Sequence, residues 1–600
     1  MSYYDSSIAS PTAPRRLFLL SGLAVVIGLA GGLAAYLLVH LIALLTNLAF
    51  FHRVAWKLPS FTQLDRSPNV ILVAVAGGLI VGLIAKWAPI IRGHGIPEAM
   101  EAVLTKQSRI APRTAVAKPV SAAIAIGTGG PFGAEGPIIV TGGAVGSLLG
   151  QIVPVSPSER KILLACGAAA GMAATFGAPL ASVVLAIELL VFEFSTRALI
   201  PLAVASSVAA AMHAALFGTG PLFSVPQHDF AGLSQLPVYA VLGLACGGLA
   251  VVINKGLFLI EEGFRHLPVK QFWWPAIGAV GFASIGLLVP RVLGVGYDQI
   301  SLVLNAKLAV GTLAILAVAK LLAWWVALGS GTSGGTLAPI LLISGSFGAL
   351  LGRLAQQVPG LHISAGAIAL AAMAATFGAA TRATFASIVF LFELTRDYNA
   401  ILPLILATVV ATLVASALMR DSIMTEKLTR RGLRVPSDYH ADILATTPVA
   451  AVMSANVETI DITSSAGEAA RRFQANGHGA YPIVDEDGHC VAIISRDDLL
   501  RNENITPDQP LREVATPDVV SVRSNDPLTE ALEKMLAEEI QHLPVIDGDR
   551  LVGMCTRADV MRARQTLRAR EQVEPGWRST RVRSRPSTNG NQPQDLTGPS

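Results

Sequence analysis

Two glutamates stand in long apolar stretches of this sequence and are its first candidates for chemistry. Within residues 117–190, the ionisable side chains outside a short, loop-like Glu-Arg-Lys run are Lys118, Glu135 and Glu188. Ionisable groups inside a membrane are costly and mark functional sites by default. Glu135 directly precedes a Gly-Pro pair, and proline suits the first turn of a helix. The free N–H groups and positive dipole end of that helix would form an anion site that the carboxylate itself can occupy, with simple helix capping as the alternative.

Two further glycine-rich turns lead into apolar segments. One is Arg92-Gly-His-Gly-Ile-Pro97, and the other is Gly329-Ser-Gly-Thr-Ser-Gly-Gly-Thr336-Leu-Ala-Pro339, which carries no carboxylate. Unpaired N–H groups at the start of a helix stabilise negative charge. Three such turns without matching cation ligands therefore predict a pathway for anions rather than for cations.

The composition places these turns in a membrane protein. Of the 600 residues, 52% are hydrophobic and 14% are charged, whereas ordinary soluble proteins carry about 25% charged residues. The mean hydropathy is +0.56. The four cysteines lie far apart, so the sequence predicts neither a disulfide framework nor a metal site. The basic excess gathers in tails and short loops, which indicates orientation in a lipid bilayer and no nucleic-acid partner.

An internal duplication organises the apolar part of the chain. Met172-Ala-Ala-Thr-Phe-Gly-Ala178 recurs unchanged at residues 373–379, and two further blocks repeat in the same order at offsets of 202 and 205. Several apolar runs are shorter than the roughly 20 residues of a straight membrane crossing. Short, interrupted segments at matching places in two halves point to a transporter with a site near the midplane. The identities alone fit parallel and inverted repeats equally well.

Basic residues predict how the chain is oriented. Two arginines precede the first apolar run, and a cluster of arginines and lysines follows the last one. By the positive-inside rule, both termini lie in the cytoplasm, so we expect a multi-pass protein of the cell (inner) membrane. The expected parts are an N-terminal tail (1–16), two membrane repeats (17–225 and 226–434), a soluble α/β domain (435–566) and a disordered tail (567–600).

The soluble domain is duplicated as well. Tyr481-Pro-Ile-Val-Asp485 is echoed by Leu543-Pro-Val-Ile-Asp547, within short β-branched runs and amphipathic helices. The pattern resembles a pair of CBS modules, small α/β units that often bind adenine nucleotides. The resemblance implies an adenine nucleotide as a regulatory ligand, while no cofactor is expected to be required.

Two short turns carry the candidate nucleotide ligands of this domain. Ser495-Arg-Asp-Asp498 and Thr556-Arg-Ala-Asp559 resemble the turns by which CBS pairs hold the ribose. The candidates are therefore Ser495, Asp498, Thr556 and Asp559. Helix N-capping explains the same residue types equally well.

The three glycine turns together resemble a known family of membrane proteins. Gly93-His-Gly-Ile-Pro97, Gly133-Ala-Glu-Gly-Pro137 and Gly334-Gly-Thr-Leu-Ala-Pro339, in this order, resemble the signature regions of the CLC chloride channels and proton/chloride antiporters. The resemblance covers roughly residues 20–430, and a C-terminal CBS pair is common in that family. It implies an all-α polytopic membrane protein with inverted repeats, followed by an α/β CBS pair. It also implies a homodimer with one pore per subunit.

The resemblance assigns roles to individual residues. Glu135 looks like the external gating glutamate, which blocks the pathway when ionised and yields it when protonated or displaced. The backbone amides of Thr336 and Leu337 would line the central anion site. The complete set of expected anion-binding residues is His94, Gly95, Ile96, Gly136, Thr336, Leu337 and Met424.

Three residues depart from the usual pattern of the family. His94 replaces a serine that donates to the central anion; a neutral imidazole still donates one N–H, and protonation would make anion binding pH-dependent. Met424 replaces a tyrosine, and a thioether offers no donor. Leu189 takes the place of the internal proton-transfer glutamate. Leucine carries no proton, which favours passive anion conduction. Glu188 beside it is expected to be a paired structural carboxylate, because its repeat mate Glu393 sits in the same context.

These observations predict a chloride or monovalent-anion channel, gated by voltage or pH through Glu135, that conducts passively. A proton-coupled antiporter is the alternative. The protein is not expected to be an enzyme, since none of the eleven histidines belongs to an H-E-x-x-H metalloprotease motif. A divalent-cation transporter is disfavoured because the apolar spans hold few carboxylates.

Overall fold

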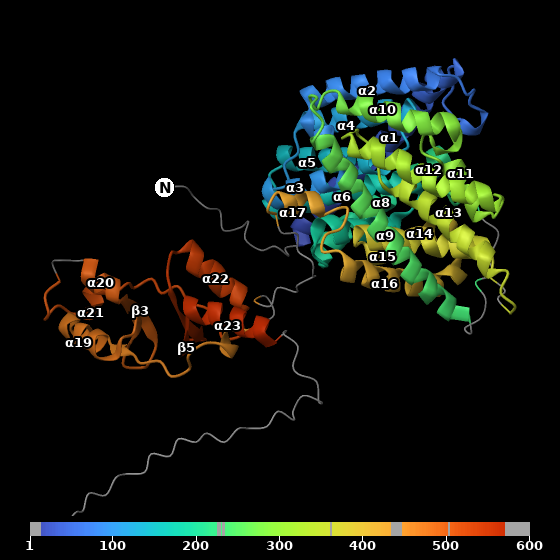
Figure 1. Ribbon diagram of the computed structural model, residues 1–600. Helices are drawn as coiled ribbons and strands as arrows, with labels where there is room; N and C mark the ends of the chain where they lie inside the picture. The colour runs from blue at the N-terminus through green and yellow to red at the C-terminus, as the bar shows by residue number, and fades with distance from the viewer. Residues whose placement is uncertain are drawn as a thin grey trace, which may run out of the picture. The chain divides into compact units, whose positions relative to one another are not determined.

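The computed structural model describes residues 14–224, 230, 235–360, 363–433, 444, 447–501 and 505–570. The chain divides into two compact units, one up to residue 439 and one from residue 440 onward. Figure 1 shows the first unit as a large bundle of helices and the second as a smaller α/β unit. Most of the two expected tails, residues 1–13 and 571–600, lies outside the described residues.

The first half of the membrane unit contains eight α-helices among the described residues. They are α1 (Pro14–Phe51), α2 (Asn69–Trp87), α3 (Ile96–Thr105), α4 (Pro112–Gly127), α5 (Glu135–Ile152), α6 (Pro157–Phe176), α7 (Pro179–Ala186) and α8 (Thr196–Phe217). Three short turns join them, η2 (Phe61–Gln63), η3 (Pro89–Ile91) and the π-helical η4 (Ile187–Val191). The first helix begins at Pro14, three residues before the expected boundary, because proline is accommodated in a first helical turn.

The second half repeats this order helix for helix. Its elements are α9 (Leu236–Arg265), α10 (Trp274–Leu288), η6 (Pro290–Val292), α11 (Tyr297–Leu304), α12 (Val310–Gly329), α13 (Leu337–Ala355), α14 (Ala365–Thr381), α15 (Thr384–Thr395), η7 (Tyr398–Ala400) and α16 (Ile401–Leu418). A short helix, α17 (Glu426–Arg430), follows and packs against α3. The equivalent helices α2 and α10 pack against each other at one edge of the bundle (Figure 1).

Local sequence signals set several of these helix starts. Proline stands in the first turn of α4, α6, α7, α9 and α10. In α6 the Ser156 hydroxyl accepts the Glu159 amide at 3.2 Å while the Glu159 carboxylate accepts the Ser156 amide at 2.8 Å. This reciprocal capping satisfies two N–H groups that a helix start otherwise leaves unpaired.

Close contacts between small residues hold the inner helices together. A Cβ atom on Gly142 of α5 would lie 2.1 Å from the Gly167 carbonyl oxygen of α6, so both positions require glycine. Such contacts drive helix association in lipid, where apolar surface gives little preference for a neighbouring helix over lipid tails. Seven helices within the described residues are long and apolar enough to cross a membrane, which agrees with a multi-pass membrane protein.

The C-terminal unit consists of two similar α/β modules. Its elements are η8 (Val449–Ala451), β1 (Ile460–Asp461), α19 (Ala466–Asn476), β2 (Ala480–Val484), β3 (Cys490–Ser495), α20 (Arg496–Arg501), α21 (Leu511–Val514), α22 (Leu528–Ala537), β4 (His542–Asp547), β5 (Arg550–Thr556) and α23 (Arg557–Arg570). Strand β2 pairs with β1 in parallel and with β3 in antiparallel orientation, and β4 pairs antiparallel with β5. Each module has its own apolar core.

The last helix, α23, extends into the segment expected to be a tail. It continues to Arg570, four residues beyond the expected end of the soluble domain at 566. The run of arginine, alanine, glutamine and leucine there is made mostly of strong helix formers, which explains the extension despite its polar composition.

Candidate functional site

The three glycine turns meet in the centre of the membrane unit. The turn before α5 touches both of the others. Gly133 forms an antiparallel bridge with Gly335, which leads into α13. A Cβ atom on Gly136 would lie 1.9 Å from the carbonyl oxygen of His94, which leads into α3. The starts of α3, α5 and α13 therefore lie together, as three separate sequence motifs predicted.

The bridge between Gly133 and Gly335 joins equivalent residues of the two repeats. The Gly335 amide donates to the Gly133 carbonyl at 2.8 Å, and the Gly133 amide donates to the Gly335 carbonyl at 3.4 Å. The two residues are 202 positions apart, the offset of the sequence blocks around them. Two equivalent segments that pair in opposite directions are related by a local two-fold axis, the relationship that inverted repeats have.

The start of α3 is buried inside the membrane unit. This helix has 10 residues, about 15 Å of length, which is half of the roughly 30 Å hydrocarbon core. Its N-terminal residues Gly95 and Ile96 are buried. The Glu98 carboxylate accepts the Gly95 amide at 2.8 Å and satisfies that one N–H group.

Glu135 lies at the meeting point of the three turns. Its side chain is 1% exposed. One carboxylate oxygen, Oε1, accepts the Tyr297 hydroxyl at 3.1 Å, while Oε2 has no hydrogen-bond partner among the described residues. A Cβ atom on Gly335 would lie 2.6 Å from Oε2. The carboxylate therefore reaches beyond its own helix to the segment that begins α13.

Tyr297 is the functional candidate that the sequence analysis missed. It is the first residue of α11, which follows the turn Gly294-Val-Gly. That turn is the repeat equivalent of Gly93-His-Gly, 201 residues away, and all four glycines have a positive φ of 62 to 100°. Extending the repeat alignment by these few residues would have drawn attention to Tyr297.

Two lysines at equivalent positions of the two repeats donate hydrogen bonds to the glycine turns. Lys118 donates to the Gly93 carbonyl at 2.8 Å and to the last carbonyl of η3 at 2.7 Å. Lys320 donates to the Gly294 carbonyl at 2.9 Å and to the last carbonyl of η6 at 2.8 Å. Both lysines are fully buried. They hold the two turns and place positive charge near the site, where an anion is stabilised.

His94 and Met424 are both buried, and His94 lies near the backbone of Ile423, the residue before Met424. His94 is 1% exposed, and neither ring nitrogen has a hydrogen-bond partner among the described residues. The charges of Lys118 and Lys427 and the backbone of Ile423 act on its ring. Met424 follows Ile423 directly and is fully buried. An imidazole N–H is therefore available to a small ligand here, whereas the thioether offers no donor.

The remaining predicted anion ligands belong to the start of α13 and to the helix opposite. Thr336 precedes α13 without capping it through its side chain, and Leu337 is its first residue; both are buried. The first amides of a helix have no partner within it. Gly136 is the second residue of α5 and is buried as well. The predicted residues thus surround one region of the bundle.

Leu189 and Glu188 have separate surroundings. Leu189 faces an apolar hollow of about 10 Å³, which Ile96 also lines, a volume that holds at most about one water. Glu188 turns away from the site, because its carboxylate accepts backbone amides at the start of α15. The structural role expected for Glu188 matches this geometry.

The two candidate nucleotide turns are built as helix caps. The Asp498 carboxylate accepts the Ser495 amide at 2.7 Å and its hydroxyl at 2.8 Å. The Asp559 carboxylate accepts the Thr556 amide at 3.0 Å and its hydroxyl at 2.6 Å. Thr556 lines a cavity of about 180 Å³ between the two modules, and Ser495 is not among its lining residues.

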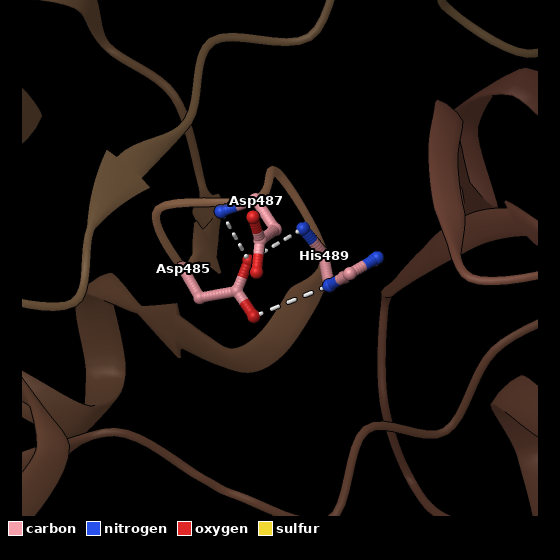
Figure 2. A group of neighbouring side chains, drawn as sticks. All are labelled: Asp485, Asp487 and His489. Carbon is pink, nitrogen blue, oxygen red and sulfur yellow. Dashed lines mark hydrogen bonds and ion pairs between the residues drawn. The ribbon is translucent and has the colours of Figure 1, made fainter.

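A third acidic turn lies between β2 and β3. Figure 2 shows Asp485 accepting bonds from the backbone of Asp487 and from His489. The His489 amide at 2.8 Å holds the pKa of the Asp485 carboxyl below its usual value. These bonds within the turn explain the cluster as a hairpin turn, so it gives no reason to assign a metal site.

The fold and the site together define a class of protein. A membrane bundle of two equivalent halves, in which helix starts meet around one buried carboxylate, is a duplicated anion transport protein. The family description "Voltage gated chloride channel" matches residues 76–416, and "CBS domain" matches 449–504 and 511–566. The chain belongs to the voltage gated chloride channel (CLC) family of anion transport proteins and carries a CBS pair, which confirms both resemblances.

Three known proteins illustrate the similarity. A "Putative chloride channel protein ClcB-like" from Ralstonia nicotianae is 31% identical over 61% of this chain and 87% of its own length. An "H(+)/Cl(-) exchange transporter ClcA" from Vibrio cholerae is 33% identical over 58% of this chain and 76% of its own length. The crystal structure of a slow cyanobacterial Cl-/H+ antiporter covers 70% of this chain and 98% of its own, with 26% identity and a TM-score of 0.60.

Proposed function

We propose that this protein exchanges chloride or a similar monovalent anion for protons across the cell membrane, with Glu135 as the group that gates the anion path and carries the proton. The observation that carries this proposal is the placement of the Glu135 carboxylate. It is buried, lies against the start of α13, and has one oxygen without a hydrogen-bond partner among the described residues. A mobile anion and the Glu135 carboxylate compete for the N–H groups at this helix start. A protonated carboxyl leaves these groups more readily than an ionised one, because it carries no negative charge.

From the sequence alone, coupled exchange is the alternative to passive conduction. The names of a relative and of a solved structure, an exchange transporter from Vibrio cholerae and a cyanobacterial antiporter, favour exchange over a passive channel. The Glu135 oxygen that has no partner among the described residues agrees with this choice, because it can take up a proton without giving up a hydrogen bond.

Leu189 favours passive conduction as a second candidate. It stands where the antiporters of the family carry an internal proton-transfer glutamate, and its surroundings are apolar. In an exchanger with this residue, the proton reaches Glu135 along the anion path rather than through position 189. The two candidates therefore differ in whether protons move at all.

The test is proton movement driven by an anion gradient in proteoliposomes. Coupled exchange predicts that chloride efflux drives proton uptake against a pH gradient. Glu135→Gln should abolish proton movement while anion flux continues. Passive conduction predicts anion flux with no proton movement in the original protein. A Glu135→Gln variant that still moves protons would contradict the role given to this residue.

We also propose ligands for the anion, an oligomeric state, an orientation in the membrane and a site for the nucleotide. The anion ligands are the N–H groups of His94, Ile96, Gly136, Thr336 and Leu337. Gly95 shapes the turn, since its own N–H is bonded to Glu98, and Met424 forms a wall that donates nothing. We further propose a homodimer in the inner membrane with both termini in the cytoplasm. An adenine nucleotide at the CBS pair would bind next to Thr556, in the cavity of about 180 Å³.

A further inference from the structure

A large hollow opens on the basic face of the membrane unit. Its volume is about 870 Å³, and its lining includes Gly93, the neighbour of His94. Lys427, Arg430 and Arg431, in α17 and just after it, line it as well. The positive-inside rule assigns this face to the cytoplasm. A ligand in the hollow would therefore stand between the cytoplasm and the candidate anion site.

The side chains that line the hollow carry a net positive charge. Eight of its lining side chains are arginines or lysines, and three are glutamates. Lys427 pairs with Glu261 at 3.0 Å. Arg109 and Arg113 are exposed and form no ion pair with any residue that the structure describes. The hollow thus presents a strong, partly uncompensated positive field.

The start of α4 adds a second, independent feature. This helix begins at Pro112 without a side-chain cap. Thr114, in its first turn, is fully buried and lines the hollow. Its hydroxyl has no hydrogen-bond partner among the residues described in this structure. Buried hydroxyls are normally bonded, so an orphan one beside an uncapped helix start indicates a missing partner.

We propose that this hollow binds a polyvalent phosphate anion from the cytoplasm and that the bound anion closes the pathway. One phosphate group would accept bonds from the Arg109 and Arg113 guanidinium groups, the Thr114 hydroxyl and the start of α4. Helix starts, arginine forks and hydroxyls together are the donors that phosphate groups prefer. The volume lies in the range of about 300–1,000 Å³ typical of small-molecule sites, far larger than a single chloride ion. This regulatory site is separate from the exchange proposed above.

Pyrophosphate is the probe, because it has the phosphate groups and lacks the adenine and ribose that a CBS pair would recognise. Thermal unfolding of the purified full chain, titrated with pyrophosphate, measures binding without any need for transport. Chloride efflux from proteoliposomes loaded with pyrophosphate on both sides measures closure. We expect pyrophosphate to raise the unfolding temperature and to slow efflux in the original protein.

Matched variants identify the donors. Arg109→Gln combined with Arg113→Gln should weaken pyrophosphate binding by at least ~10-fold, the usual effect of losing charge-assisted bonds. Thr114→Val should weaken it by about 5-fold. The unfolding temperature without pyrophosphate should not change, since the hydroxyl has no hydrogen bond to lose within the described part of the chain. Arg66→Gln, an exposed arginine outside the hollow, is the control and should bind like the original protein.

Three outcomes would overturn the proposal. The first is an original protein that does not bind pyrophosphate, and the second is equal binding by the double arginine variant and the control. The third concerns the source of the phosphate. If phosphatidic acid in phosphatidylcholine vesicles slows efflux while pyrophosphate does not, a lipid headgroup rather than a soluble anion occupies the hollow.

Discussion

Glu188 and Glu393 cap each other's repeats. The Glu188 carboxylate accepts the first amides of α15 at 3.1 and 3.0 Å. The Glu393 carboxylate accepts the first amides of α7 at 3.0 and 2.7 Å. The two residues are 205 positions apart and occupy equivalent places. Each carboxylate thus accepts hydrogen bonds from the start of the equivalent helix in the other repeat and stabilises that helix start.

Loss of either cap should therefore reduce stability without altering transport. Glu188→Ala and Glu393→Ala each remove a capping carboxylate, so each should cost about 0.5–2 kcal/mol in folding free energy. The unfolding temperature of the purified protein measures this cost. Glu193→Ala, in the exposed loop after η4, is the control. Glu193 forms an ion pair with Lys161 at 3.5 Å on the surface, and such pairs contribute little to stability. A change in the proton-to-anion ratio of the Glu188 variant, at normal stability, would contradict a purely structural role.

The bond between Tyr297 and Glu135 should set how readily the gate opens. Tyr297→Phe removes the hydroxyl that donates to Oε1 at 3.1 Å. A bond to a charged group is worth about 1.5–3 kcal/mol, so the closed arrangement should lose up to roughly 10–100-fold in relative population. Anion flux measured in proteoliposomes should rise. A flux equal to or below that of the original protein would argue that the tyrosine does not hold the closed carboxylate.

His94 should act on the anion as a hydrogen-bond donor rather than as a titrating group. His94→Ser keeps a donor at the start of α3, and His94→Val removes it. Because neither ring nitrogen has a partner among the described residues, His94→Val should lower anion flux, whereas His94→Ser should keep it. Anion flux measured in proteoliposomes checks this expectation. Equal flux in the two variants would exclude the ring as an anion ligand.

His542 should make the second CBS module less stable in acid. Burial lowers the pKa of His542 below its usual value, and Asp559 opposes this effect in part. The unfolded chain therefore binds the proton more tightly, so stability is complete above about pH 6.5 and falls as the pH drops through that value.

Hydrogen exchange of the full chain checks this expectation. After correction for intrinsic rates, peptides from β4 and β5 should lose protection between pH 7.5 and 5.5. His542→Gln should reduce that loss, whereas the same change at the exposed His489 should not. Equal protection at both pH values would show that the half-buried ring of His542 does not couple protonation to folding.

Much of this architecture is readable from local sequence. Apolar runs, proline in first turns and the blocks around Met172 and Met373 predict the helices and their duplication, because helix starts and periodicity depend on neighbouring residues. The three glycine turns likewise identify the family and the region of the candidate site. The same local signals do not determine where a helix ends. For that reason α23 continues to Arg570, past the expected end of the soluble domain at 566.

Contacts between distant residues were decided by the tertiary structure alone. Tyr297 reaches Glu135 across 162 residues, and the caps of Glu188 and Glu393 cross between repeats. The pairing of Gly133 with Gly335 in opposite directions has no local signature either. These contacts depend on the two-fold relationship between the halves, which arises from how the helices pack. A sequence repeat establishes that two halves are alike, whereas only packing establishes which faces of those halves meet.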